Sequence, residues 1–505
     1  MKGKLGWLGE KLCLGFGLLF SGVVLVQTFL TACRGGGFFL FFAAGALGMG
    51  ALVFLGLRFL KPAKAYPLAL CSLRFLIALG VILVFGAQPV QDFKTMYDAA
   101  CQMARGSGDY LQNEYFYNWA YQTGFTAYEA LVIRLFGEGL LPLQLLNALW
   151  MAGTGCLVYG IARRFLPETG AMAASLLYAL YPAPYFLAAV LTNQHIAVFF
   201  YYLGFWLLVR RERLSPLRGV LAGVCLSLGN VMRPLGAVIV LALLCWAAVR
   251  MLRWKGPGVL REGGLLLAAA VAYYASGELF NWLVRATGLN PEGLANHLPL
   301  WKFVLGFNLE SGGAWNQADY GAYYLLPREE APAAMRAAVG ERLSSLGVSG
   351  FLELFWKKSQ TMWGSLEYLY WGFGHLDGSV QVLGGLTLSQ CLNALNYFDR
   401  GVFFLAFFLA AAALLLWLRR GAGEGLRLPV MLSFLLCGYY AVHLLIEVQS
   451  RYRYFLMPAV FLLAGAGAQQ LLRCWQGRSS RGAGQKNTAP GREGRHFLEK
   501  TGKGT

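Results

Sequence analysis

The feature that most constrains this chain is its series of long apolar runs, which are separated by short clusters of Lys and Arg. An α-helix that crosses the hydrocarbon core of a bilayer needs about 20 mostly apolar residues. Charged residues make up only 13% of the chain, whereas an average soluble domain has about 25%. The pattern predicts an all-α polytopic membrane protein. It excludes an ordinary soluble enzyme, a disordered chain and a disulfide-stapled secreted module.

Apolar runs of sufficient length predict about 12 transmembrane helices, of which 194–209 and 216–232 are short. The predicted ranges are 12–33, 38–57, 68–87, 140–162, 169–191, 194–209, 216–232, 235–252, 263–284, 401–418, 428–446 and 454–473. We found no internal repeat and no Gly-rich phosphate loop between them.

The 43 Lys and Arg residues, which give the chain a net charge of +18, are unevenly distributed. When the N-terminus is placed in the cytoplasm, most of them fall in inner segments, and the outer segments carry a slight excess of acid. Cytoplasmic loops of membrane proteins are generally enriched in Lys and Arg. The charge therefore indicates topology rather than nucleic-acid binding. It predicts a multi-pass plasma-membrane protein with cytoplasmic N- and C-termini.

This topology divides the chain into five parts. They are two extra N-terminal helices (1–67), a membrane core (68–284) with an outer loop (88–139), a large extracytoplasmic loop or cap (285–400), C-terminal helices (401–475) and a basic cytoplasmic tail (476–505). Long structureless loops are uncommon, so we expect short surface helices in both outer segments, including an amphipathic one at 124–137. The tail has almost no apolar residues, which predicts disorder.

The ten cysteines form no zinc or redox motif, because no pair has CxxC spacing. Cys101 and Cys391 fall in the two outer segments, so a disulfide between them is one alternative. No metal-ligating residues stand out, although a divalent cation is compatible with the chemistry considered below.

A carboxylate follows the third predicted helix, in the sequence Gln91–Asp92–Phe93, and the next acid is Asp98. Partly dry surroundings at a helix exit raise the pKa of a carboxyl group and suit a base that takes a proton from a hydroxyl. Asp92 is therefore a candidate catalytic base. A solvated acid or a helix cap is the structural alternative.

Aromatic and amide side chains alternate shortly afterwards, at Tyr121 and Gln122, with Tyr128 following. Aromatic rings stack on the apolar faces of sugars, and amides bind hydroxyls. The same residue types are also typical of the belt at a membrane interface. The segment is thus a candidate sugar-binding or acceptor-binding site with an ordinary structural alternative.

Two arginines, Arg451 and Arg453, lie at the outer end of the eleventh predicted helix, where topology does not explain them. Guanidinium groups bind phosphate through two parallel hydrogen bonds. Arg233, at an outer hairpin tip, is a second phosphate candidate, although it could instead snorkel to lipid headgroups. Glu447 is four residues before Arg451 and would pair with it in a helix. An ion-pair clamp between loops is the alternative for the arginine pair.

In this order, the motifs resemble those of the GT-C superfamily of membrane glycosyltransferases, family 39, the protein-mannosyltransferase and aminoarabinose-transferase branch. The matching pieces are Asp92, 121–125 with Tyr128, 233–236 and 447–458, within 68–475. The resemblance implies a GT-C-like fold. It also implies a sugar donor on a polyprenyl phosphate, no nucleotide, and inverting transfer to a hydroxyl on the outer face of the membrane.

The resemblance also implies roles for single residues. Asp92 corresponds to the catalytic base. Several relatives carry two neighbouring acids in the first outer loop, and here the second catalytic acid is either Asp98 or missing. Arg451, Arg453 and, less directly, Arg233 correspond to residues that hold the donor phosphate. Tyr121, Gln122, Tyr128 and Glu447 are assigned to the sugar or acceptor.

The expected partners are a polyprenyl-phosphate-linked hexose or pentose donor, a lipid, cell-surface polymer or protein acceptor, and membrane lipids, with no nucleic acid. A transporter or flippase for lipid-linked saccharides would use the same arginines and aromatics without chemistry. Transporters usually show broken midplane helices or repeated halves, and the sequence shows neither. A polymerase or ligase of surface polysaccharide is a further alternative.

Overall fold

The computed structural model describes residues 2–60, 64–209, 215–253, 257–364, 373, 376–420 and 427–484. Nearly all the secondary structure in these residues is helical. The strands described there are a short antiparallel pair, β1 (Gln381–Leu383) and β2 (Leu386–Thr387). The prediction of an all-α polytopic membrane protein is therefore confirmed.

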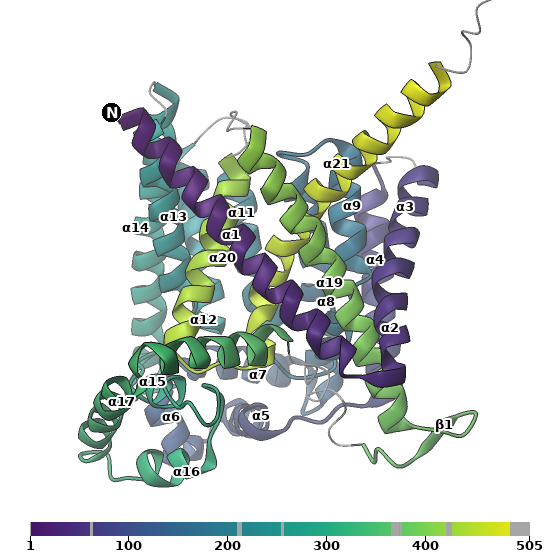
Figure 1. Ribbon diagram of the computed structural model, residues 1–505. Coiled ribbons are helices and arrows are strands. Elements are labelled where there is room, and N and C mark those ends of the chain that lie inside the picture. Colours follow the sequence, from purple (N-terminus) through teal and green to yellow (C-terminus); the bar gives the residue numbers. More distant parts are fainter. Residues whose placement is uncertain are drawn as a thin grey trace, which may run out of the picture.

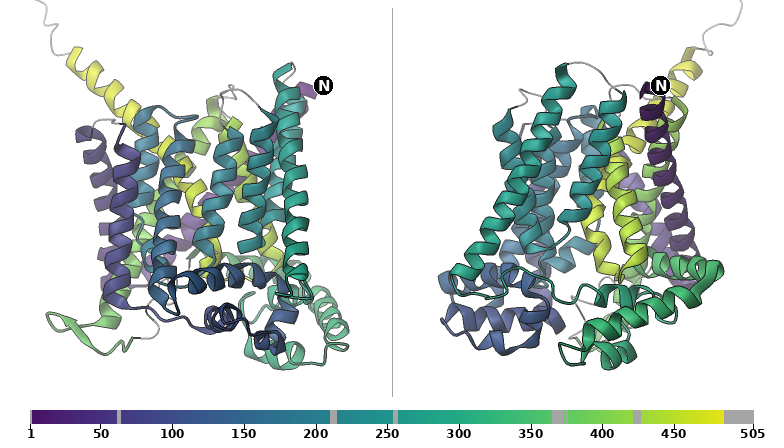
Figure 2. Two further views of the ribbon diagram at one scale, coloured as in Figure 1. Left: turned by 180° about the vertical axis from the view of Figure 1, so that it is seen from behind. Right: turned by 90° about the vertical axis from the view of Figure 1, so that its left-hand side faces the viewer.

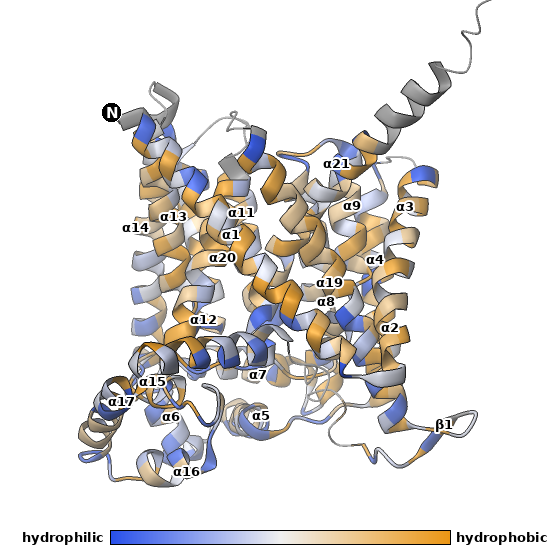
Figure 3. Cartoon of the chain, viewed as in Figure 1, coloured by the Kyte–Doolittle hydropathy of each residue, from blue (hydrophilic) through white to orange (hydrophobic). Residues whose placement is uncertain are grey.

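A bundle of apolar helices forms the body of the protein (Figure 1). It contains α1 (Lys2–Cys33), α2 (Phe39–Ala43), α3 (Met49–Phe59), α4 (Tyr66–Phe85), α8 (Leu140–Ala162), α9 (Glu168–Ala179), α10 (Ala183–Ala188), α11 (Gln194–Val209), α12 (Pro216–Met232), α13 (Gly236–Arg253), α14 (Pro257–Ala286), α19 (Leu388–Arg420), α20 (Arg427–Leu445) and α21 (Met457–Gly484). Apolar residues dominate the middle of the bundle and polar residues gather at its two ends (Figure 3).

Shorter elements gather at one end of the bundle. They are α5 (Gln91–Ala104), η3 (Asp109–Gln112), α6 (Glu114–Asn118), η4 (Ala120–Gln122), α7 (Thr123–Phe136), α15 (Trp301–Gly306), α16 (Gln317–Asp319), η5 (Tyr320–Tyr324), α17 (Ala331–Ser359), η6 (Gln360–Gly364) and η9 (Ser450–Leu456). The N-terminus and the end of α21 lie at the opposite end (Figures 1 and 2). The two predicted outer segments thus share one end of the molecule, and the described chain termini share the other.

Seven helices in the described residues are long and apolar enough to span a membrane, and four shorter apolar helices accompany them. Each predicted span other than 169–191 coincides with an apolar helix. The prediction of one continuous helix at 169–191 is wrong, because the chain breaks between α9 and α10. Pro182 lies at this break and Pro184 in the first turn of α10, and proline lacks the N–H that a continuous helix requires.

The outer segments and the tail also differ from expectation in detail. Residues 285–400 contain the β1–β2 hairpin as well as helices. Cys101 and Cys391 are both free thiols, so the alternative of a disulfide between them is not realised. Residues 476–484, predicted to be disordered, continue α21 as helix. The rest of the predicted tail lies outside the described residues.

The predicted extra N-terminal helices pack closely on α19. A Cβ atom on Gly401 would lie 2.1 Å from the carbonyl oxygen of Phe42, and one on Gly45 would lie 2.1 Å from that of Phe398. Only glycine allows such close backbone contact. Gln27 of α1 donates to the Trp356 carbonyl and accepts from the Ser359 hydroxyl. The first helix therefore also supports α17 in the outer segment.

Candidate active site

A cavity of about 1210 Å³ lies where the ends of the bundle helices meet the outer segments. Its ionisable lining, apart from tyrosines, comprises Asp92, Arg233, Lys302, His443, Glu447 and Arg451. Its aromatic lining comprises Tyr115, Trp119, Tyr121, Trp301, Phe303, Trp315, Tyr320, Tyr324, Tyr439 and Tyr452. Of the nine residues predicted from sequence, six line this one cavity: Asp92, Tyr121, Gln122, Arg233, Glu447 and Arg451.

Asp92 lies in the first turn of α5, a helix that buries Phe93 and Met96 on one face. Amphipathic spacing of this kind fixes a helix against the protein and leaves its polar face exposed. The Asp92 side chain remains 54% exposed and lines the cavity together with Thr95. The preceding residue, Gln91, has a φ of 49°, the left-handed region, which no other described non-glycine residue adopts.

Arg451 belongs to η9 and faces the same part of the cavity. Its Nη2 lies 3.8 Å from Asp92 Oδ2, and its Nε donates to Gln449 Oε1 at 2.7 Å. The separation from Asp92 exceeds a normal hydrogen bond. The guanidinium also lies 4.9 Å from the centre of the Phe93 ring. Segments far apart in sequence thus bring a carboxylate and a guanidinium to the same place.

Glu447 lies deeper, with a side chain only 2% exposed. It forms an ion pair with Lys302, and it accepts hydrogen bonds from Gln449 Nε2 at 2.7 Å and the Tyr452 hydroxyl at 3.2 Å. Burial alone would raise the pKa of Glu447, but Lys302 outweighs it and holds the pKa below its usual value. Burial would likewise lower the pKa of Lys302, but Glu447 raises it.

The predicted helical pair of Glu447 with Arg451 is not formed, because residues 446–449 are not helical. Instead, Lys358 of α17 holds this segment. Its buried ammonium donates to the carbonyl oxygens of Gly306, Leu444 and Ile446 at 2.7–2.9 Å. Burial lowers the pKa of Lys358 to about 7.

Arg233 follows the end of α12 and is linked to the predicted residue Gln122 through Asn193. Its Nη1 donates to Asn193 Oδ1 at 3.1 Å, and Asn193 Nδ2 donates to Gln122 Oε1 at 3.4 Å. Tyr121, beside Gln122, is fixed by a backbone hydrogen bond to Ala295 at 3.0 Å. Burial raises the pKa of Tyr121 to about 12, so its phenol is neutral and can donate to a hydroxyl oxygen.

Three predicted site residues lie outside the cavity lining. Asp98 pairs with Lys94 on the exposed face of α5, because six residues of α-helix rotate a side chain to another face. Arg453 is fully buried and donates to the Met362 carbonyl at 2.8 Å, because two residues of a 3₁₀-helix turn it away from Arg451. Tyr128 accepts a hydrogen bond from Trp150 Nε1 at 3.1 Å.

Lys302 and the aromatic residues contributed by 285–400 are not among the residues predicted from sequence. This segment is visibly rich in Tyr and Trp, and that is the signal that could have found them. Its Tyr and Trp residues follow no helical or alternating period, so no pattern singles out particular rings. Their common location depends on the fold of the loop.

Metal binding has no candidate site in the described part of the chain. It contains no group of three or more His, Cys, Asp or Glu side chains that could hold a metal ion. The carboxylates that line the cavity are Asp92 and Glu447, and Glu447 is engaged by Lys302. The divalent cation considered from sequence stays a prediction, because one or two carboxylates together with substrate phosphates can also hold such an ion.

The helical bundle has a polar cavity at one end, and the motifs around it follow one another along the chain as in the GT-C resemblance. These features define the class of the protein as a polytopic membrane protein. Residues 125–274 match the family model described as dolichyl-phosphate-mannose-protein mannosyltransferase. This match, which runs from α7 into α14, confirms the resemblance to GT-C superfamily glycosyltransferases. The comparison with curated proteins found no match.

Solved structures with some similarity are membrane enzymes. The apo oligosaccharyltransferase of Archaeoglobus fulgidus is 14% identical with a TM-score of 0.40, over 83% of this chain and 52% of that chain. The oligosaccharyltransferase AglB of that organism, in complex with an inhibitory peptide and a dolichol-phosphate, is 13% identical with a TM-score of 0.39. That comparison covers 85% of this chain and 53% of that chain. ArnT of Cupriavidus metallidurans, bound to undecaprenyl phosphate, is 16% identical with a TM-score of 0.37, over 80% of this chain and 78% of that chain. The chain spans about half the length of the oligosaccharyltransferase.

Proposed function

We propose that this protein is an inverting glycosyltransferase that moves a hexose or pentose from a polyprenyl-phosphate-linked donor to an acceptor hydroxyl. The observation that carries the proposal is the 3.8 Å approach of Arg451 to Asp92 within one large cavity. A base and a phosphate-binding group are required side by side in such a reaction. The matching family model is named for a lipid-phosphate-linked mannose donor, which supports this donor class.

Asp92 is the better base of the two carboxylates that line the cavity. Glu447 is buried and already bound by Lys302, Gln449 and Tyr452. Its low pKa makes it a poor proton acceptor. Asp92 is more than half exposed, and its nearest ion-pair partner is 3.8 Å away. A substrate hydroxyl can therefore reach Asp92 without displacing a tight ion pair.

The phosphate of the donor would lie among the cations of the cavity, Arg233, Lys302 and Arg451. These three cations face two carboxylates, which leaves an excess of positive charge for an anion. Arg451 can offer a two-pronged contact to phosphate oxygens. Fixed positive groups that face a developing negative charge lower the barrier to reaction, because they need no rearrangement during it.

In the proposed step, the acceptor oxygen forms a bond to the anomeric carbon while the bond from that carbon to the phosphate oxygen breaks. The hydroxyl proton passes to the Asp92 carboxylate. The electron pair of the broken bond leaves with the phosphate oxygen, which gives polyprenyl phosphate. Attack from the face opposite the leaving group inverts the anomeric configuration.

The reaction is proposed to occur on the outer face of the plasma membrane, with both termini in the cytoplasm. The uneven distribution of Lys and Arg supports this orientation. Single cysteines introduced near residues 110 and 330 should react with an impermeant reagent added from outside. A cysteine near residue 485, which lies outside the described residues, should not. Outside labelling at 485 would reverse the topology and contradict an outer active site.

Mass spectrometry of surface polymers and lipids tests the activity directly. Cells that contain the protein should carry a sugar that is absent without it and in the Asp92→Asn variant. Identical spectra in all three strains, with the protein expressed at equal levels, would contradict the proposal.

A further inference from the structure

Four aromatic side chains form a continuous series along one side of the cavity. The ring of Trp315 lies 5.1 Å from Tyr320, and Tyr320 stacks on Tyr324 at 4.9 Å. Tyr324 stacks on Trp119 at 6.4 Å and accepts a hydrogen bond from its Nε1 at 3.1 Å. All four line the cavity. We name these four residues the aromatic side.

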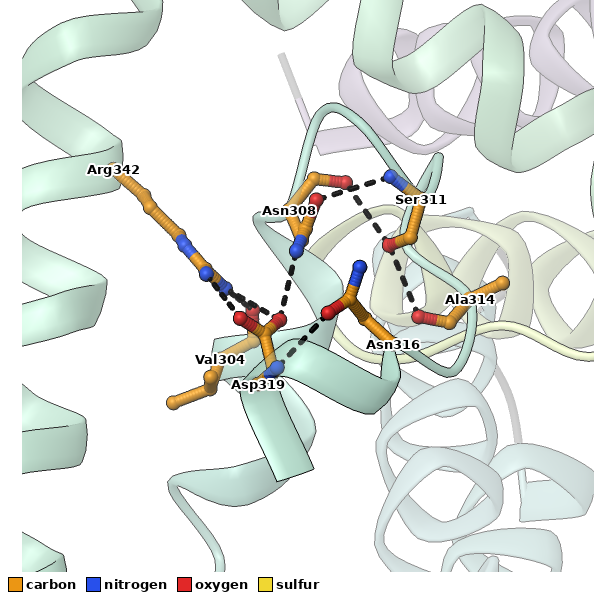
Figure 4. A network of polar contacts seen from close by, with 7 residues as sticks. All are labelled: Val304, Asn308, Ser311, Ala314, Asn316, Asp319 and Arg342. Atoms are coloured by element: carbon orange, nitrogen blue, oxygen red, sulfur yellow. Dashed lines mark hydrogen bonds and ion pairs between the residues drawn. The ribbon is translucent and has the colours of Figure 1, made fainter. Parts of the chain in front are cut away.

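The outer end of the aromatic side is exposed although it is firmly held. Trp315 is 49% exposed, and the residues on either side of it belong to a hydrogen-bonded network (Figure 4). Ser311 Oγ donates to the Ala314 carbonyl at 3.1 Å, and Asn316 Oδ1 accepts from the Asp319 amide at 2.9 Å. A large exposed ring held in one conformation loses little entropy when a ligand binds.

An ion pair with a buried carboxylate anchors this network to α17. The Asp319 carboxylate accepts from Arg342 Nη2 at 2.6 Å and Nη1 at 3.1 Å, and from Asn308 Nδ2 at 2.8 Å (Figure 4). Arg342 also donates to the Val304 carbonyl. The network therefore ties the loop before α16 to both α15 and α17, and it fixes Trp315 and Tyr320 relative to the cavity.

Amide side chains accompany the rings. Gln122, Asn296 and Gln317 line the same cavity. An amide offers both a donor and an acceptor, as a sugar hydroxyl does, and aromatic rings pack on apolar C–H faces. An acyl chain would gain nothing from the amides. The combination therefore fits a saccharide.

The inner end of the aromatic side reaches the charged residues. Lys302 Nζ lies 5.3 Å from the centre of the Trp119 ring and forms an ion pair with Glu447. A chain of sugar units that follows the rings inward would bring its terminal residue to the part of the cavity that contains Asp92 and Arg451.

We propose that the aromatic side is a subsite for an acceptor saccharide, so that the acceptor is a glycan rather than a peptide. The inference rests on the proposed glycosyl transfer and adds the chemical class of its acceptor. Tryptophan and tyrosine also form belts at membrane interfaces. Belt residues project toward lipid, whereas these four rings contact one another and line a cavity.

Saccharide binding without donor tests the subsite. The full chain, reconstituted in nanodiscs, is titrated with fluorescent conjugates of maltotriose, cellotriose, chitotriose and mannotriose, and with a Ser/Thr-rich peptide. At least one trisaccharide should bind. Trp315→Ala should weaken this binding at least ~10-fold, and Trp315→Phe should weaken it less because a ring is kept. Trp356→Ala is the matched control, since Trp356 is 44% exposed and is not part of the cavity lining.

Three results would overturn the subsite: no trisaccharide binds, Trp315→Ala binds as well as the wild type, or only the peptide binds in a Trp315-dependent way. Asp92→Asn separates this inference from the proposed function. It should bind the trisaccharide like the wild type and fail to transfer sugar. If Asp92→Asn still transfers sugar while Trp315→Ala has lost saccharide binding, the proposed base is wrong and the subsite stands.

Discussion

The cavity has two sides of different construction. The charged side, Asp92, Arg233, Glu447 and Arg451, comes from the ends of bundle helices and the segments next to them. The aromatic side draws Trp315, Tyr320 and Tyr324 from the outer segment 285–400, with Trp119 from the other outer segment. Catalytic groups need a fixed geometry, whereas loops vary readily in shape and recognise different ligands. This difference matches the two proposals, in which the charged side performs the reaction and the aromatic side binds the acceptor.

Replacing Asp92 should have the largest effect and should separate the two sides most clearly. Asp92→Asn keeps the size of the side chain but cannot accept a proton. Turnover should fall by ~10²–10⁴, while donor affinity and saccharide affinity hardly change. Single-turnover transfer and equilibrium binding measure the two quantities.

Asp98→Asn is the control, because Asp98 lies on the same helix and outside the cavity lining. Full turnover in Asp92→Asn would remove the base assignment. A loss confined to Asp98→Asn would transfer the role to Asp98. A folded Asp92→Asn that no longer binds donor would indicate a binding role instead.

Arg451 should show the next largest effect, on donor binding rather than on acceptor binding. Arg451→Lys keeps the charge but loses the two-pronged contact. Hydrogen bonds to charged groups contribute about 1.5–3 kcal/mol each, so donor affinity should fall on the order of 10- to 100-fold. Binding of a polyprenyl phosphate in nanodiscs is the measurement.

Arg453→Lys is the matched comparison, because Arg453 is two residues away and fully buried against the Met362 carbonyl. It should lower the unfolding temperature and leave donor affinity nearly unchanged. Equal losses of donor affinity in both variants would restore the sequence prediction that the two arginines act together. An unchanged affinity in Arg451→Ala would leave the ion-pair clamp as its role.

The ion pair of Glu447 with Lys302 joins the two sides, since Lys302 also lies over Trp119. Glu447→Gln leaves the ammonium without its buried anionic partner and should cost about 2–3 kcal/mol of stability. The pKa of Glu447 is lowered in the folded state from an ordinary 4.5, and that of Lys302 is raised from an ordinary 10.5. The ion pair of the wild type therefore contributes its full stabilisation between the two ordinary pKa values, 4.5 and 10.5.

Its contribution should disappear as the pH falls through the lowered pKa of Glu447, or rises through the raised pKa of Lys302. Thermal unfolding of the wild type and Glu447→Gln across pH measures this. Their difference should shrink in acid, as the pH falls below 4.5 and Glu447 becomes protonated. A difference that grows on acidification would contradict the ion pair.

The two sides also differ in how far the sequence predicts them. Asp92, Arg233 and Arg451 were found because charge beside an apolar run is informative, and because topology does not explain an outer arginine. Their position along the chain also fixed their position in space, since each lies at a helix end. Sequence could not separate Arg451 from Arg453, because their difference depends on the 3₁₀ turn of η9.

The aromatic side could not be predicted residue by residue. The contacts from Trp315 to Trp119 join two outer segments that are distant in sequence. They depend on the network around Asp319, which pairs with Arg342 across 23 positions. Long-range pairing in a loop leaves no periodic pattern in a single sequence. The break at Pro182 is the opposite case, because a local proline signal was present but the apolar run around it suggested a continuous helix.

The smallest predicted effect concerns backbone strain at Gln91, which precedes Asp92 of the charged side. Among the described non-glycine residues, Gln91 is the only one with a positive φ. An L-residue in the left-handed region costs about 1–2 kcal/mol, a cost that glycine avoids. Glycine usually destabilises a helix relative to alanine by roughly 0.5–1 kcal/mol. At residue 91 we expect the opposite sign, with Gln91→Gly about 1 kcal/mol more stable than Gln91→Ala. Both variants remove the side chain, so their difference in unfolding temperature isolates the backbone.

If the strain also holds Asp92 in place, Gln91→Gly should have lower turnover than Gln91→Ala despite its greater stability. A Gln91→Ala variant that is the more stable of the two would show that the left-handed conformation is not imposed on this residue, and that the charged side has no backbone strain to distinguish it from the aromatic side.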